Sequence, residues 1–196
     1  QPILLVRDAK GKILEKMESV KSERVIDPKI AYLISDILSD NSARAAAFGY
    51  GSDLYIPGHM VAVKTGTTNN LKDNWTIGYT PNRVVAVWVG NNDNSSMSYV
   101  ASGVTGASPI WRKIMNTILD KQAPTVFTPP ADLIKANICV ITGELTCAGC
   151  PTKAEFFIPG TQPARACNPE NIKKILEDKV KKDQEERDRI LNGISR

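Results

Sequence analysis

The middle of the chain carries three short runs of apolar and β-branched residues separated by polar ones. They cover Met60–Val63, Trp75–Thr80 and Val84–Gly90. A polar loop follows the first run, and a turn at 80–83 that contains a Pro-Asn pair joins the second run to the third. Short runs of this composition between turn residues predict β-strands. Because the connections are short, we expect the three strands to form an antiparallel meander.

Two segments on either side of these strands repeat apolar residues at helical spacing. Each begins with a residue suited to capping a helix, Asp27 or Ser108, and a proline follows at the first helical position. The apolar stripes are Ile30, Leu33, Ile34, Ile37 and Leu38 in the first segment, and Ile110, Trp111, Ile114, Met115, Ile118 and Leu119 in the second. We expect each helix to bury its stripe and the second helix to pack across the meander.

Two hairpins are expected outside this central part. Near the N-terminus, the apolar runs at 3–6 and 12–17 flank a turn that ends in Gly11. Near the C-terminus, the runs at 138–141 and 145–147 flank Thr142-Gly143-Glu144. Both patterns are typical of two strands joined by a tight turn.

The last segment predicts a charged helix. Asn168 is a suitable cap, Pro169 fits the first turn, and the helical pattern runs toward Gly193. Its apolar residues are sparse, and 181–189 is nearly all charged. We expect a solvated helix that docks only through its first turns. A partner-binding helix or a coiled coil is the alternative, although the missing heptad core at 181–189 argues against a coiled coil.

These patterns together predict an α+β fold in which helices pack on an antiparallel sheet, followed by a small Cys-bearing β tail and a C-terminal helix. The prolines between 120 and 136 favour an extended linker. The expected organisation is a sheet-and-helix unit at 1–119, a Pro-rich linker at 120–136, a small Cys-containing β module at 137–168 and a charged helix at 169–196.

The first apolar run leads directly into Lys64-Thr65-Gly66, which Thr67 and Thr68 follow. A glycine lacks a Cβ, so a peptide can approach an edge strand closely at that position. Threonine hydroxyls can donate to a carboxylate, and the backbone N–H of Thr67 can help to hold an oxyanion. Lys64 would supply a positive charge that favours an anionic substrate and eases proton movement. The alternative interpretation is an ordinary surface hairpin with a turn glycine.

Longer stretches accompany this triplet. They are Asp8–Lys12, Val25–Pro28, Asp40–Arg44, Phe48-Gly49, Asp73–Trp75, Ile77–Pro81, Val87–Asp93 and Ala107–Trp111. Together with Lys64–Thr68 they resemble the C-terminal half of the transpeptidase domain of class A, bifunctional penicillin-binding proteins. The resemblance covers about residues 3–119 closely and 137–168 loosely.

The resemblance implies a serine acyl transferase that cross-links peptidoglycan without a cofactor. In this family a serine attacks the penultimate D-Ala carbonyl of a stem peptide, expels the terminal D-Ala and passes the acyl group to an amine of a neighbouring stem. The resemblance assigns Lys64 as the catalytic residue of this segment. It assigns Thr65, Gly66, Thr67 and Thr68 to substrate binding.

The chain does not contain the nucleophile that this chemistry needs. No serine is followed three positions later by a lysine, so we expect the isolated chain to form no acyl-enzyme. Ser39-Asp40-Asn41 spells the family's Ser-x-Asn motif, but it lies only 25 positions before Lys64, at a helix end, and we interpret it as a helix-end sequence. The lone His59 has no Cys or His partner at metal spacing and is expected to have a loop role.

The remaining expectations concern the longer protein. The chain opens at Gln1 without an initiator Met and has no run of 18 apolar residues, so we expect a piece of a longer protein. The resemblance implies a glycosyltransferase domain and a membrane anchor upstream, and a periplasmic or cell-surface location. It implies peptidoglycan stem peptides and lipid II-derived glycan strands as partners and β-lactams as inhibitors. The net charge is only +4 and no basic stripe is present, so nucleic acid is not expected as a partner.

The four cysteines, Cys139, Cys147, Cys150 and Cys167, allow two kinds of site. Small exported modules with little core are commonly stabilised by disulfides, which we favour, with Cys150–Cys167 and Cys139–Cys147 as the preferred pairing. A zinc site with four thiolate ligands is the alternative, but it lacks a second closely spaced pair. Free thiols remain a third interpretation.

Two other functions stay open at this point. One is a hydrolase of the same superfamily, a DD-carboxypeptidase or a β-lactamase, because these enzymes share the Lys-Thr-Gly motif. The other is a non-catalytic module for cell-wall or protein binding, centred on residues 137–196.

Overall fold

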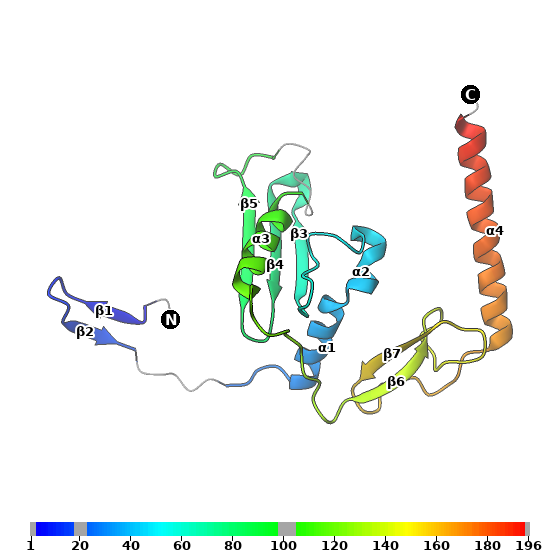
Figure 1. Ribbon diagram of the computed structural model, residues 1–196, viewed down its shortest axis with the longest axis horizontal. Coiled ribbons are helices and arrows are strands. Elements are labelled where there is room, and N and C mark those ends of the chain that lie inside the picture. Colours follow the sequence, from blue (N-terminus) through cyan, green and yellow to red (C-terminus); the bar gives the residue numbers. More distant parts are fainter. Residues whose placement is uncertain (1–2, 18–22, 98–104, 195–196) are drawn as a thin grey trace.

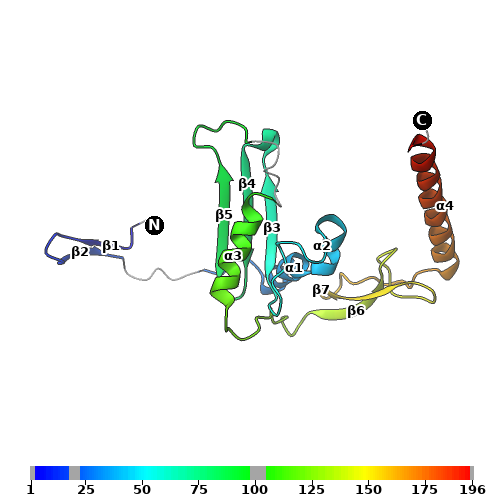
Figure 2. The ribbon, with the colours of Figure 1, turned by 45° about the horizontal axis from the view of Figure 1, so that its top comes forward.

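The computed structural model describes residues 3–17, 23–97 and 105–194 of the chain. At its centre lies a three-stranded sheet with helices beside it (Figure 1). A short hairpin near the N-terminus lies on one side of this centre, and a second hairpin with a long helix lies on the other (Figures 1 and 2). The α+β fold predicted from the sequence is confirmed.

The central sheet consists of β3 (Ala62–Thr67), β4 (Asp73–Tyr79) and β5 (Val84–Gly90), in this order and all antiparallel. This is the meander that the three apolar runs predict. A 3-10 turn, Asn69–Leu71, lies in the loop between β3 and β4. Because β4 is central, β3 has one edge that pairs with no other strand of the described chain.

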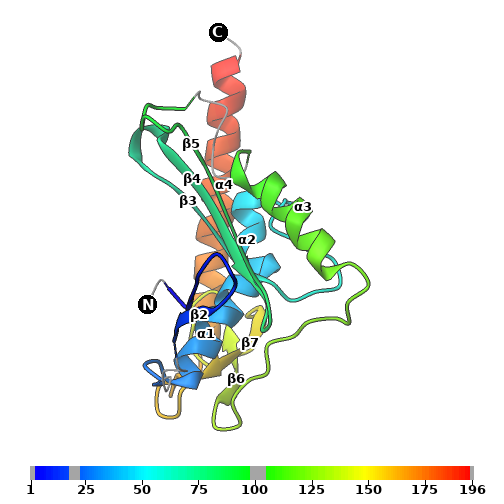
Figure 3. The same cartoon turned by 90° about the vertical axis from the view of Figure 1, so that its left-hand side faces the viewer.

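Helix α3 (Ala107–Leu119) covers one face of this sheet (Figure 3). Its side chains Trp111 and Met115 are completely buried against β4 and β5, as expected for a helix packed across the meander. Ile110 and Ile114, however, are exposed, so the predicted stripe was too wide. The buried row runs at i, i+4 and i+8 through Trp111, Met115 and Leu119, and residues one position earlier are turned about 100° away from it.

The expected N-cap of α3 was also wrong. The helix begins at Ala107, one residue before Ser108, and Gly106 occupies the cap position. The Ser108 hydroxyl is buried in the first turn, 2.9 Å from Thr76 Oγ1 of β4. Ser108 therefore joins the helix to the sheet instead of capping the helix.

Helix α1 (Pro28–Ser39) begins where the sequence predicts, since Asp27 accepts a hydrogen bond from the Lys29 amide. The face that it buries was wrongly predicted. Tyr32 and Ser35 are buried, and the predicted stripe leaves Ile30, Ile34 and Ile37 exposed and Leu33 and Leu38 half-buried. The reason is tertiary: the helix presents its Tyr32–Ser35 side to the rest of the described chain, where Ser35 Oγ lies 2.9 Å from the Tyr79 hydroxyl. Helix α2 (Asn41–Phe48) follows directly.

The face of the sheet opposite α3 is apolar and exposed. Residues on this face include Trp75 and Trp88, both 41% exposed, with Ile77 and Val84. Lys64 shares the face, because it is paired in register with Ile77. Apolar side chains grouped on one exposed face are typical of a surface that contacts another protein segment or a ligand.

The N-terminal hairpin is formed by β1 (Leu5–Arg7) and β2 (Ile13–Lys16), which pair antiparallel as predicted. The C-terminal hairpin differs from its prediction. Its strands are β6 (Ile134–Cys139) and β7 (Thr152–Phe157), and β6 begins inside the stretch expected to be linker. The turn at Gly143, where φ is +73°, leads only to a single bridge between Ile138 and Leu145.

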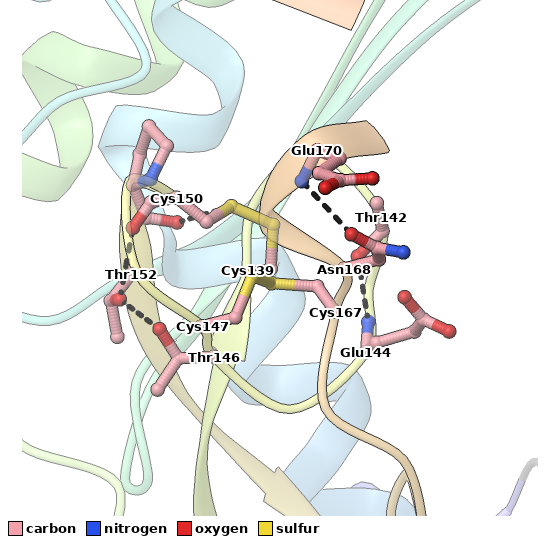
Figure 4. Close-up of a disulfide and its surroundings, with 11 residues drawn as sticks. Cys139, Thr142, Glu144, Thr146, Cys147, Cys150, Thr152, Cys167, Asn168 and Glu170 are labelled. Atoms are coloured by element: carbon pink, nitrogen blue, oxygen red, sulfur yellow. Dashed lines mark hydrogen bonds between the residues drawn. A yellow bond between two sulfur atoms is a disulfide. The ribbon is translucent and has the colours of Figure 1, made fainter. Parts of the chain in front are cut away.

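All four cysteines are in disulfides, but the preferred pairing was wrong. The bonds join Cys139 to Cys150 and Cys147 to Cys167, with Cα–Cα distances of 5.6 and 5.3 Å (Figure 4). The register explains the difference. Across the predicted turn, the Cys139 amide donates to the Glu144 carbonyl, so Cys139 lies opposite Glu144 and not opposite Cys147. In the β6–β7 pair, Cys139 lies opposite Thr152, which is two residues from Cys150.

Helix α4 (Pro169–Ile194) starts as predicted, with Asn168 Oδ1 accepting from the Glu170 amide at 2.9 Å. Ile172 is buried against Cys139 and Cys167. Ile175, Leu176 and Val180 are exposed. Docking through the first turn alone is confirmed, and the helix then projects away from the module (Figures 1 and 2).

Candidate functional site

The Lys64–Thr67 segment forms the C-terminal part of β3, at the edge of the sheet. The amide of Thr68 donates to the Asp73 carbonyl at 3.0 Å, so Thr68 and Asp73 form a hydrogen-bonded pair of the antiparallel ladder. Backbone groups alternate in direction along a strand. The N–H and C=O groups of Thr65 and Thr67 therefore point away from β4, toward the open edge of β3.

Lys64 lies beside that edge and is exposed. Its ammonium group donates to the Thr65 carbonyl at 2.7 Å, one of the outward-pointing groups of the strand. Lys64 and Thr65 also line a cavity of about 180 Å³ between β3 and the helices. The other lining residues are Ile37, Leu38, Arg44, Phe48, Leu54 and Val63. A cation at the rim of a mostly apolar cavity can hold an anionic group whose remaining atoms lie on apolar side chains.

A second cation lies at the same cavity. Arg44 donates to the Leu38 carbonyl at 2.9 Å, while its Nη1 is buried without a hydrogen-bond partner in the described chain. Burial lowers the pKa of the Arg44 guanidinium, and the neighbouring Asp40 carboxylate partly opposes this. The cavity wall beside β3 therefore carries positive charge from two elements.

Gly66 is not required by the packing of this chain. A Cβ built at Gly66 would meet only the Cβ of Trp75, at 3.8 Å, an ordinary contact. At Gly78, in contrast, a Cβ would lie 2.3 Å from the Trp111 ring. The space above Gly66 is thus available to a molecule that approaches the edge of β3.

Thr67 and Thr68 are held by two residues of β4 that were assigned no role from the sequence. The Thr68 hydroxyl donates to Asp73 Oδ2 at 3.1 Å and accepts from the Asp73 amide at 2.8 Å. Asp73 Oδ1 also accepts from the Trp88 indole at 2.9 Å. Asn74 Nδ2 donates to Thr67 Oγ1 at 3.3 Å. The sequence carried no direct signal for this contact, because the register that pairs Thr67 with Asn74 is set by the geometry of the loop between β3 and β4.

The Ser39-Asp40-Asn41 sequence has local structural contacts, in agreement with its interpretation as a helix end. Ser39 donates to the Asp36 carbonyl, Asp40 caps α2 by accepting from the Ala43 amide, and Asn41 donates to the Tyr50 carbonyl. His59 lies in a loop, as expected, where its backbone amide donates to the Ile56 carbonyl. Its Nδ1 atom has no hydrogen-bond partner within the described ranges.

The sulfur atoms of Cys139, Cys150 and Cys167 lie within 4.8 Å of one another. This spacing results from the two disulfides, which leave no thiolate free to bind a metal ion. The module is therefore stabilised by covalent links between its own strands and loops. No helix within the described ranges has the length and apolar character that a membrane crossing requires.

Comparisons with known proteins place this geometry in a family. Residues 1–116 match the family described as "Penicillin binding protein transpeptidase domain", and residues 129–171 match "Penicillin-binding protein 1A, C-terminal domain". Penicillin-binding protein 1A from Clostridium tetani is 31% identical over 83% of this chain, and that from Escherichia coli is 30% identical over 72%. The crystal structure of penicillin-binding protein 1A from Haemophilus influenzae superimposes with a TM-score of 0.59 over 74% of this chain, at 28% identity.

The chain spans only about a fifth of the length of these relatives, namely 21% and 18% of the two sequences and 22% of the solved chain. The family match covers more than half of this chain, and it includes the β3 edge with its Lys-Thr-Gly sequence. This chain therefore belongs to the penicillin-binding protein transpeptidase family, and its residues 129–171 match the C-terminal domain of penicillin-binding protein 1A.

Proposed function

We propose that this chain forms one wall of the acyl-transfer site in a longer, bifunctional penicillin-binding protein that cross-links peptidoglycan. In this proposal the β3 edge binds the D-Ala-D-Ala end of a stem peptide, and a serine outside this chain attacks the penultimate carbonyl. A glycosyltransferase domain, a membrane anchor and an extracytoplasmic location belong to the longer protein. The domain organisation is part of the same proposal, with boundaries after 119 and 168 as expected from the sequence and with the linker ending before β6 instead of after 136.

The observation that carries the proposal is the combination of an open strand edge with an unobstructed glycine. The amides of Thr65 and Thr67 point outward, and Gly66 leaves space beside them. An extended peptide can add to such an edge as a further strand. The Thr67 amide is then available to an oxyanion, which would be stabilised in the transition state more than in the ground state.

Charge supports the same substrate class. A stem peptide ends in a carboxylate, and the Lys64 ammonium lies at the edge where that end would bind. The hydroxyls of Thr65 and Thr67 are donors for the carboxylate oxygens. Lys64 would also lie beside the attacking serine and favour the loss of its proton. Thr68 is directed toward Asp73, so in this proposal it holds the end of the strand in place.

The test uses the longer protein that contains this chain. Wild-type protein should be labelled covalently by a fluorescent penicillin and should release D-Ala from a stem-peptide substrate. Lys64→Ala should slow labelling by about 100-fold, the range expected when a proton-transfer group is removed. Gly66→Val should slow it at least about tenfold by blocking the edge. Gly51→Ala is the matched control, since a Cβ there meets nothing within 4 Å.

Unlabelled wild-type protein, or a Lys64→Ala variant labelled at the wild-type rate, would overturn the proposal. The products distinguish transfer from hydrolysis. If an added amine acceptor captures the acyl group, the enzyme is a transpeptidase, whereas release of free acid alone identifies a carboxypeptidase or β-lactamase.

A further inference from the structure

A fully buried amide side chain lies directly behind the proposed substrate-binding edge. Asn74 of β4 is 0% exposed and contacts two different elements. Its Oδ1 accepts a hydrogen bond from the Ala107 amide at the start of α3, at 2.7 Å. Its Nδ2 donates to Thr67 Oγ1 on β3, at 3.3 Å. Asn74 therefore connects the helix on the sheet to the edge strand.

The contact with Ala107 fixes the orientation of the Asn74 amide. A backbone N–H can only donate, so the atom of Asn74 that faces Ala107 must be the oxygen. The nitrogen is then the atom that faces Thr67, and the usual ambiguity of an amide flip does not arise. A buried amide with a partner at each end has little freedom to reorient, because the alternative leaves two polar groups unsatisfied.

This orientation determines what the Thr67 hydroxyl can do. Asn74 Nδ2 has no lone pair to offer, so Thr67 Oγ1 must accept from it. The hydroxyl proton of Thr67 is then directed elsewhere, and Thr67 is exposed. The register pairs Thr67 with Asn74 at a position where the two strands exchange no backbone hydrogen bonds, which brings their side chains close together.

We propose that Asn74 is a positioning residue that keeps the Thr67 hydroxyl as a donor toward the substrate carboxylate. This inference rests on the proposed function, because it needs an anionic ligand at the β3 edge. Asn74 itself touches no substrate. Its effect reaches the ligand only through Thr67.

The decisive variant is Asn74→Asp, which has nearly the same shape. One oxygen of the new carboxylate still accepts from the Ala107 amide. The other oxygen replaces the Nδ2 donor that faces Thr67, so Thr67 now meets an acceptor. The Thr67 hydroxyl would turn to donate to it and would no longer be available to the ligand. In the longer protein we expect the efficiency of acylation by penicillin to fall about tenfold, the loss expected for one hydrogen bond to a charged group.

The kinetic form of the loss identifies its origin. If the Thr67 hydroxyl binds the penicillin carboxylate equally strongly in the ground state and in the transition state, its loss weakens the apparent affinity for penicillin and leaves the maximal acylation rate unchanged. We therefore expect Asn74→Asp to raise the penicillin concentration needed for half-maximal acylation about tenfold while the rate at saturation changes little. Structural damage at the site would lower both.

A double-mutant cycle and a matched control separate positioning from packing. In a Thr67→Val background, Asn74→Asp should cause no further loss, because the group through which it acts is gone. Thr76→Val is the control: Thr76 lies two residues further along β4, is 0% exposed, and bonds α3 through Ser108. It should lower stability and leave acylation within about twofold of wild type.

Asn74→Ala removes both contacts and leaves the Thr67 hydroxyl free to rotate. The acylation efficiency of Asn74→Ala should lie between those of wild type and Asn74→Asp. This variant replaces Asn74→Asp in the test if the aspartate variant folds poorly. Wild-type protein that takes up no penicillin would refute the proposed function itself. Labelled wild type with an unchanged Asn74→Asp variant, or an equal loss in the Thr67→Val background, would refute the positioning role alone.

Discussion

Lys153 Nζ lies 2.6 Å from Asp40 Oδ2 and so joins the Cys-containing module to the corner between α1 and α2. The same Asp40 caps α2 through its other oxygen. Burial acts to raise the pKa of Asp40, but the hydrogen bonds from Lys153 and the α2 amides outweigh it, and the pKa lies below its usual value. Tyr32 and Phe156, whose rings meet edge to face at 5.3 Å, add an apolar contact between the same two units.

The ion pair should contribute to stability in a pH-dependent way. A double-mutant cycle with Lys153→Met and Asp40→Asn, which keeps the capping oxygen, should give a coupling free energy of about 0.5–1 kcal/mol at pH 7. Because the folded pKa of Asp40 is lowered, this stabilisation is present above the unfolded value of about 3.9 and is lost as the pH falls through the folded value. Denaturant titrations at pH 7 and pH 2 measure the change. Lys179→Met on the exposed part of α4 is the control, and equal coupling at both pH values would contradict the prediction.

Asp36 should show the opposite dependence on pH. Burial raises the pKa of its carboxyl, and Glu155 and Asp40 add repulsion that Lys153 only partly offsets. For a raised pKa, stability is fully present below the unfolded value and declines as the pH rises through the folded value. Asp36→Asn should therefore raise the melting temperature at pH 7, by no more than about 2 °C because the group is partly exposed, and leave it unchanged at pH 3. Asp183→Asn on α4 should have no effect at either pH.

The disulfide pairing can be read directly by peptide mapping. Digestion without reductant should yield peptides that link Cys139 to Cys150 and Cys147 to Cys167. Replacing either pair by serine should destabilise the module by about 3 kcal/mol, with the 20-residue separation costing slightly more than the 11-residue one. The first turn of α4 should lose protection from hydrogen exchange in both variants, because Ile172 packs on Cys139 and Cys167. Unchanged protection of that turn would show that the helix does not depend on the module.

Two glycines of the sheet should respond differently to alanine. Gly78→Ala brings a Cβ against the Trp111 ring, which is completely buried, and should cost about 2–3 kcal/mol. Gly66→Ala meets only an ordinary contact and should change stability by less than about 0.5 kcal/mol. Denaturant unfolding of both variants gives the comparison. Equal losses would mean that Gly66 has a packing role.

The isolated chain should not react with β-lactams. It has no serine followed by a lysine three residues later, so in the proposed function the groups on β3 would bind an anion without forming an acyl-enzyme. Incubation with a fluorescent penicillin followed by denaturing gel electrophoresis should show no labelled band, with the longer protein as the positive control. Covalent labelling of the 196-residue chain would reveal a nucleophile that the family chemistry does not require.

Local sequence by itself determined most of the helices and strands of this protein and the segment proposed to bind substrate. Periodicity, caps and turn residues were sufficient for the meander, the helix starts at Pro28 and Pro169, and the N-terminal hairpin. The Lys64–Thr67 segment could be assigned to an edge because it ends the first strand of a three-strand meander. These features depend on neighbours within a few positions, which a sequence displays directly.

Tertiary structure decided which faces are buried and which distant residues meet. The apolar stripe of α1 is exposed because the described chain packs on its Tyr32–Ser35 side. The disulfide pairing differs from the expected one because β6 forms its ladder of pairs with β7 and not with the segment 145–147 that follows the predicted turn. The Asn74 bridge needed two contacts at once, one across a strand pair and one to a helix 33 positions away. Such relationships depend on how elements are placed in space, and local periodicity carries no information about that placement.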